Sequence, residues 1–219
     1  MNISNRCSLA FALIATISWN AHSADADTKS QANEAVERMS FYRDEASKLS
    51  SSAIFKEMER LRNIQALKNQ SAGLTFAMDE DSFKSVGYAT ALEARRKTNE
   101  PAGAFFWGAY NWRICGVMQG ADKGQLGDAV KNCWLESLES FKVASAGEIS
   151  GASFNIARLY EKGWGVTPSK LVAAEWFVKA ANQYNKDGSR EEALTSVEAA
   201  LNMVPDHPAA LRLRNAMLK

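Results

Sequence analysis

The side chains with the clearest potential for chemistry are two cysteines, Cys115 and Cys133, in the central part of a chain of 219 residues. A third cysteine, Cys7, lies near the amino terminus. Two thiols can form a disulfide, bind a metal ion, act as a redox pair or stay free. No CxxC spacing is present and no histidine lies nearby. The sequence therefore favours a structural disulfide between Cys115 and Cys133, with the other three uses as alternatives.

Two predicted helices position this pair. One runs from Pro101 to about Gln119, and a glycine-containing loop follows over 120–127. Asp128 is suited to cap the next helix, which extends to about Ala146. Each cysteine lies roughly 6 to 8 Å from the loop along its helix, so antiparallel helices would bring the thiols face to face. Closing this loop would stabilise the fold by about 3 kcal/mol in the chain-entropy model.

Other arrangements for catalysis or metal binding are absent from the sequence. His207 lies in a proline-flanked turn, where a surface or capping role is expected. The acidic runs Glu191-Glu192 and Asp79-Glu80-Asp81 suit a helix start and a loop better than a pair of catalytic carboxylates. No phosphate-binding loop and no nucleophile motif appears. We therefore expect no bound metal, no cofactor and no enzymatic activity.

The amino terminus has the pattern of a secretory signal. An uncharged, mostly apolar run over 8–19 follows Arg6, and Ala21-His22-Ser23 offers small residues for a signal peptidase. We expect cleavage between Ser23 and Ala24, or one residue later, and a periplasmic or secreted mature chain. The alternative is a membrane anchor, which needs about 20 apolar residues. No other stretch is long and apolar enough to span a bilayer.

The charge of the chain argues against nucleic acid as a partner. The formal net charge is +1, and Arg6 is the only charged residue in the predicted signal, so the mature chain would be neutral. The dense basic run is Arg95-Arg96-Lys97, which fits a solvated last turn of a helix.

Residues 24–98 predict an N-terminal helical segment. We expect 24–31 to be disordered and 30–69 to form one long helix or two consecutive ones, with Ser50-Ser51-Ser52 as the interruption. A loop over 70–81 follows, and Asp81 can cap a helix that ends near Lys97. The helical stripe over 30–69 favours packing on the same chain, and a coiled-coil dimer arm is the alternative.

An aromatic cluster lies in the helix that carries Cys115. Its members are Phe105, Phe106, Trp107, Tyr110 and Trp112. They cover more than one face of the helix, which favours burial between neighbouring helices. A groove for a small ligand is the alternative.

The C-terminal region predicts four further helices. Ser150 can cap the first, which would end at Gly163, and Thr167-Pro168 would start the second, which reaches about Lys186. Ser189 and Glu192 have capping-box spacing for the third. Pro205 would stop that helix, and Pro208 would start the last.

Two repeat patterns overlap in this region. Residues 152–186 resemble a Sel-one-like repeat through Ala157, Tyr160, Gly163, Gly165, Val166, Ala173, Trp176 and Lys179-Ala180-Ala181. Residues 174–205 resemble a tetratricopeptide repeat through Phe177, Ala180, Ala181, Tyr184, Ala193, Val197, Ala200 and Pro205. Residues 141–147 are similar to the end of an earlier, degraded repeat, and some exported members of the Sel-one-like family are also cross-linked by cysteines.

The resemblance implies an all-α fold, an α-solenoid of antiparallel helix pairs preceded by the N-terminal helical segment. The expected organisation is a signal peptide over 1–23, a helical segment over 24–98 and a repeat domain over 99–219. The implied function is protein–protein interaction, as a periplasmic adaptor, scaffold or regulator of an envelope complex. By resemblance the partner would lie along the exposed positions Glu175, Lys179, Asn182 and Lys186.

Two alternatives accompany this function. One is a cysteine-stapled repeat enzyme that acts on cell-wall-type substrates, since hydrolysis of β-lactams has been proposed for some relatives. The other is an oligomeric structural component of an envelope or motor assembly, self-associating through residues 30–69. The identity of the protein partner is left open.

Overall fold

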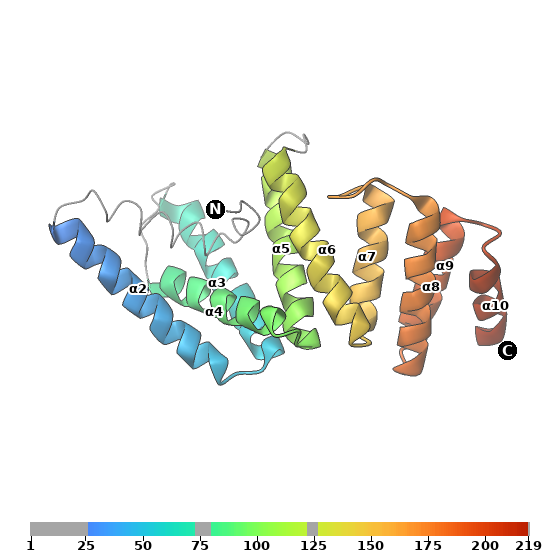
Figure 1. The fold of residues 1–219 in the computed structure, drawn as a ribbon, viewed down its shortest axis with the longest axis horizontal. Helices are drawn as coiled ribbons and strands as arrows, with labels where there is room; N and C mark the ends of the chain where they lie inside the picture. Colours follow the sequence, from blue (N-terminus) through green and yellow to red (C-terminus); the bar gives the residue numbers. More distant parts are fainter. Residues whose placement is uncertain (1–25, 73–79, 122–126, 219) are drawn as a thin grey trace. The chain divides into compact units, whose positions relative to one another are not determined.

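The computed structural model describes residues 26–72, 80–121 and 127–218, and all regular secondary structure in these ranges is α-helical (Figure 1). This confirms the all-α prediction. The predicted signal segment, residues 1–23, lies outside the described residues. The chain divides between Thr98 and Asn99 into two compact units, which are described separately.

The first unit contains three described helices, in which α4 packs against both of the others. They are α2 (Ala26–Ser47), α3 (Ser51–Ala72) and α4 (Glu80–Lys97). Part of its core is formed by Ala35 and Met39 of α2 with Phe83 of α4. Further along the apolar stripes, Ala46, Ile54, Met58 and Leu61 are also buried.

The break between α2 and α3 agrees with the predicted interruption of the stripe. Ser50 Oγ accepts a hydrogen bond from the backbone N–H of Ala53 at 3.2 Å, as an N-cap does. Two consecutive helices, rather than one long helix, therefore occupy this segment. The predicted disorder of 24–31 is wrong from Ala26 onward, because α2 already begins there.

Arg95 corrects the prediction of a merely solvated basic turn. Its guanidinium donates to Ser51 Oγ at 2.8 Å and to the backbone carbonyl of Ser47 at 3.1 Å, and it also donates to the carbonyl of Leu49. Carbonyls at the end of a helix have no intrahelical partner, and a cation satisfies them well. Arg95 therefore ties the last turn of α4 to the α2–α3 connection.

The second unit is a row of six described helices in which each packs against the next along the chain (Figure 1). They are α5 (Pro101–Ala121), α6 (Asp128–Ala146), α7 (Ser150–Lys162), α8 (Lys170–Lys186), α9 (Arg190–Met203) and α10 (Pro208–Met217). One core joins α5, α6 and α7, and a second joins α7, α8, α9 and α10. Helix α7 contributes to both, through Ile156 and Leu159 to the first and through Ala157 to the second.

Two glycines shape the connection between α7 and α8. Gly163 ends α7 in the left-handed conformation, as predicted, with φ of 70°. Gly165 has φ of 73°, and a Cβ on it would lie only 2.7 Å from the Cβ of Trp134 on α6. This close approach lets Trp164 stack on Trp134, with ring centroids 4.6 Å apart.

Several predicted helix starts are displaced by one or two residues. The N-cap of α6 is Gly127, and Asp128 is already helical. The N-cap of α7 is Ile149 in place of Ser150. Helix α8 starts after Ser169, whose Oγ accepts from the Val172 N–H at 3.3 Å, so the predicted start at Thr167-Pro168 is wrong.

The starts of the last two helices are closer to the prediction. Ser189 is the N-cap of α9, but it makes no side-chain capping bond, so the predicted capping box with Glu192 does not form. Pro208 is the first residue of α10, as predicted. His207 caps that helix, because its Nδ1 accepts from the Ala210 N–H at 3.3 Å. The histidine expected in a surface or capping role is therefore a capping residue.

Candidate functional site

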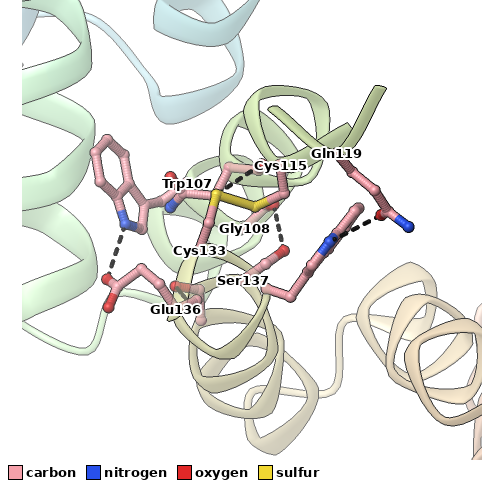
Figure 2. Close-up of a disulfide and its surroundings, with 10 residues drawn as sticks. Trp107, Gly108, Cys115, Gln119, Cys133, Glu136 and Ser137 are labelled. Atoms are coloured by element: carbon pink, nitrogen blue, oxygen red, sulfur yellow. Dashed lines mark hydrogen bonds between the residues drawn. A yellow bond between two sulfur atoms is a disulfide. The ribbon is translucent and has the colours of Figure 1, made fainter. Parts of the chain in front are cut away.

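The two central cysteines form the predicted pair. Their Sγ atoms lie 2.13 Å apart, and the Cα atoms of Cys115 on α5 and Cys133 on α6 are separated by 5.6 Å (Figure 2). Both side chains are buried. A buried disulfide inside a helix hairpin stabilises structure and offers no exposed thiol for exchange chemistry.

Hydrogen bonds join the same two helices on either side of the disulfide. Ser137 Oγ donates to the carbonyl of Gly108 at 2.8 Å, and Trp107 Nε1 donates to Glu136 at 3.2 Å (Figure 2). Toward the other end of α5, Trp134 Nε1 donates to Gln119 Oε1 at 3.2 Å. The α5–α6 hairpin is thus cross-linked at several levels along its length.

The aromatic cluster on α5 contributes to packing. Trp107 is almost completely buried. Trp112 meets Trp134 and Trp164 edge to face, with centroid distances of 5.3 and 5.2 Å. Phe105 and Trp112 are both packed against the first core. These contacts favour the packing interpretation over a ligand groove for Trp107, Trp112 and Phe105.

The residues predicted to bind a partner lie at intervals of three and four along α8. Glu175 and Asn182 are exposed. Lys186 forms an ion pair with Glu148 at 2.9 Å, and Lys179 Nζ lies 4.9 Å from the centre of the Trp176 ring. The hydrogen bond from Lys186, followed by the charges of Lys186 and Lys179, lowers the pKa of Glu148. Asn182 Nδ2 donates to the backbone carbonyl of Val178 at 2.9 Å. Three of the four residues therefore already have partners within the chain.

A groove that the sequence analysis missed lies between α7 and α9. It has a volume of about 770 Å³ and is open to solvent. We call it the α7–α9 groove; its lining residues are Phe154, Arg158, Arg190, Glu191, Leu194, Thr195, Glu198, Ala199 and Asn202. A smaller hollow of about 380 Å³ adjoins it, shares Phe154, Glu191 and Thr195 with it, and adds Tyr184 and Glu192.

The floor of the groove is apolar and held in place by the core. Phe154 packs edge to face on the buried ring of Phe177, with centroids 5.1 Å apart. Leu194 and Ala199 of α9 are half-buried and contact the second core. These apolar residues lie at positions that are not part of the repeat signature. Apolar residues outside the signature could therefore have indicated the groove from the sequence. None of the four predicted binding residues lines the groove.

The groove is lined by two arginines and two glutamates, Arg158 and Arg190 with Glu191 and Glu198. Arg158 pairs with Glu161 at 3.0 Å, and Arg190 donates to the backbone carbonyl of Met217 at the end of α10. Glu191, Glu192 and Glu198 are exposed, and no described cation forms an ion pair with them. Burial, followed by the charges of Glu192 and Asp187, raises the pKa of Tyr184 at the edge of the smaller hollow.

The described residues contain no group of three or more histidine, cysteine, aspartate or glutamate side chains placed to hold a metal ion. Among the helices of the described ranges, none has the length and apolar character needed to cross a membrane.

The comparisons with known proteins add no relative. No family model, no curated protein and no solved structure matches the chain. The resemblance to Sel-one-like and tetratricopeptide repeats therefore rests on the sequence pattern alone.

Proposed function

We propose that this chain is an exported helical-repeat module of the Sel-one-like or tetratricopeptide-like kind that binds another protein in the bacterial envelope, with the α7–α9 groove as its binding site. The groove is the observation that carries the proposal. It offers an apolar floor that includes Phe154 and Leu194, and such a floor gains stability when a partner covers it.

The arrangement of the second unit supports a solenoid-like module. Each helix packs on the next, and α7 and α9 both pack against α8, which leaves an open hollow between them. Surfaces of this kind are what stacked-helix proteins use to hold extended partners. The buried disulfide is compatible with the oxidising compartment that the predicted signal implies.

The proposal is tested by site-specific photo-crosslinking in cells. A photoreactive residue at Thr195, in the groove, is compared with one at Glu175, on the face of α8 predicted from the sequence. We expect a discrete crosslinked protein from Thr195 only. Crosslinks from Glu175 alone would favour the α8 face, and an absence of crosslinks from both positions would contradict the proposal.

A variant pair sharpens this experiment. Phe154→Ala removes most of the apolar floor and should reduce the Thr195 crosslink at least fivefold. Leu171→Ala removes an apolar side chain that is 56% exposed elsewhere on the second unit, and it should leave the crosslink unchanged. Circular dichroism of both purified variants checks that they are folded, so that a lost crosslink in Phe154→Ala is not due to unfolding.

Export is tested separately. We expect the periplasmic fraction to contain a chain whose amino terminus is Ala24 or Asp25, as measured by mass spectrometry of the intact protein. An uncleaved chain in the membrane fraction would support the anchor alternative.

A further inference from the structure

The Cys115–Cys133 disulfide lies in the interior of the second unit. Cys115 is 0% exposed and Cys133 is 1% exposed. Both belong to the core that joins α5, α6 and α7, together with the buried side chains of Val130, Trp134 and Leu138. A molecule in solvent therefore has no direct approach to either sulfur atom.

The two helices that carry the cysteines are packed without slack. The Cα atoms of Cys115 and Cys133 are only 5.6 Å apart. Two turns earlier on α5, a Cβ on Gly108 would lie 2.8 Å from the ring of Phe141 on α6. The bond from Ser137 to the Gly108 carbonyl closes the hairpin on this side of the disulfide, and the bond from Trp134 to Gln119 closes it on the other (Figure 2). Exposure of the sulfurs thus requires α5 and α6 to separate.

The chemistry that forms such a bond needs the exposure that the packed hairpin denies. In thiol–disulfide exchange, the thiolate of one cysteine attacks an external disulfide, forms a mixed disulfide and expels one thiolate. The thiolate of the other cysteine attacks the mixed disulfide, closes the bond and expels the second thiolate. The two cysteine protons pass to the expelled thiolates, so the cysteines are oxidised and the external disulfide is reduced to two thiols. The intermediate carries a foreign group on a sulfur that is buried in the packed hairpin.

We propose that the Cys115–Cys133 bond forms before the α5–α6 hairpin packs, by exchange with an external disulfide, and that the packed hairpin then protects the bond from reducing thiols. Oxidation of the open chain therefore precedes assembly of the core that joins α5, α6 and α7. Neither step involves the α7–α9 groove, so this order of events and the proposed function can fail independently.

The first test measures reduction of the purified mature protein by dithiothreitol, in native buffer and in concentrated urea. Samples are alkylated at intervals, and the intact mass gives the reduced fraction. Glutathione disulfide, which has no fold, measures the effect of urea on the exchange itself. After this correction we expect reduction to be at least about a hundredfold slower in native buffer, because the hairpin must open first. A smaller ratio would overturn the proposal.

A variant pair tests whether separation of the helices limits the reaction. Ser137→Ala removes the bond to the Gly108 carbonyl and leaves both sulfurs in place, so it should speed reduction in native buffer about three- to tenfold without changing the rate in urea. Lys131→Ala, at an exposed position of α6, is the control and should change neither rate. Circular dichroism checks that both variants are folded. An unchanged native rate for Ser137→Ala would contradict the need for helix separation.

The second test follows formation of the bond. The protein is reduced in urea, the urea is removed, and glutathione disulfide is added. If circular dichroism shows that the reduced chain is folded, the bond should form at least about a hundredfold more slowly than in urea, and a smaller ratio would overturn the proposal. A reduced chain that folds only after oxidation would support the proposed order directly.

Discussion

At the scale of residues, a buried polar network fixes how three helices of the second unit meet. Ser145 of α6 donates to Ser153 of α7 at 2.7 Å, because the Ser153 hydroxyl in turn donates to Gln183 Oε1 of α8 at 2.5 Å. The Gln183 amide donates to the backbone carbonyl of Ser145 at 3.1 Å. All three side chains are nearly or fully buried. Each polar group is satisfied by another, so the network permits only one register of the helices.

Ser153→Ala should therefore lower the free energy of unfolding by more than the removal of one hydroxyl usually does. It leaves the Ser145 hydroxyl and Gln183 Oε1 without their partner in a buried site, which destabilises by about 1 to 3 kcal/mol. Urea denaturation followed by circular dichroism measures the loss. Ser196→Ala is the matched control, since this buried hydroxyl only adds a second bond to the helix carbonyl of Glu192 and its removal should cost less than about 0.5 kcal/mol. Equal losses for the two variants would contradict the importance of the network.

Another residue-scale prediction concerns Glu57 in the first unit. Hydrogen bonds from Arg60 and Lys84, together with their charges, lower its pKa to about 2. A carboxylate with a lowered folded pKa stabilises the fold above its unfolded pKa, near 4.5, and this contribution is lost as the pH falls toward 2.

Glu57→Gln should accordingly reduce stability at neutral pH. Between pH 4.5 and pH 2, the variant should lose less stability than the unaltered protein. Thermal unfolding of the protein and the variant across this range measures the difference. Glu37→Gln, an exposed substitution on α2, is the control and should follow the unaltered protein. A difference that stays constant over the whole range would contradict the assignment to Glu57.

At the scale of elements, apolar spacing and helix-breaking residues predict where helices exist but not where each one starts. Gly163 and Pro208 act through backbone conformation, which is local, and both predictions are confirmed. The expected caps Ser150 and Asp128 are wrong because the preceding residue takes the cap position in each case. Ser150 instead donates to the Asp187 carboxylate at 3.1 Å, a tertiary contact that local sequence cannot reveal.

The groove could not be predicted for a related reason. The repeat pattern identifies the residues that pack helices together, and it assigned a binding face to α8 by analogy with the first helix of a pair. The hollow arises from the spacing of α7 and α9, which depends on how both pack on α8. Only Phe154 and Leu194, apolar residues outside the pattern, could have indicated it from the sequence.

The hairpin of α5 and α6 gives a prediction at the same scale. Replacing Cys115 and Cys133 by alanine should lower the free energy of unfolding by about 2 to 4 kcal/mol, the range for a disulfide that closes a loop of this size. Chemical denaturation with and without reductant measures it. Reductant should destabilise the unaltered protein after unfolding exposes the bond, and it should leave the double variant unaffected. A reductant effect on the variant would show that another process is involved.

At the scale of the whole molecule, the division at Thr98 and Asn99 suggests two independent folding units. We expect a fragment of residues 99–219 to be helical and to unfold cooperatively, because both cores of the second unit are built from α5 to α10. Circular dichroism with thermal unfolding tests this. A fragment without a cooperative transition would mean that the second unit needs residues of the first.

The same fragment tests self-association through residues 30–69. If those helices form an oligomer, the molar mass of the mature chain measured by light scattering should exceed the mass calculated from its sequence. The fragment 99–219 should stay monomeric. Equal, monomeric behaviour of both would exclude this route to an oligomer at the concentrations measured.

The covalent link between α5 and α6 also determines how far the chain can be stretched. The two cysteines are 18 positions apart, so a force applied to the ends of the protein passes through the sulfur–sulfur bond and bypasses the residues between them. At about 3.3 to 3.6 Å per extended residue, the hidden length is about 60 Å. In a single-molecule pulling experiment the oxidised protein should therefore release about 60 Å less contour length than the reduced protein, a mechanical signature that reports the redox state of each molecule.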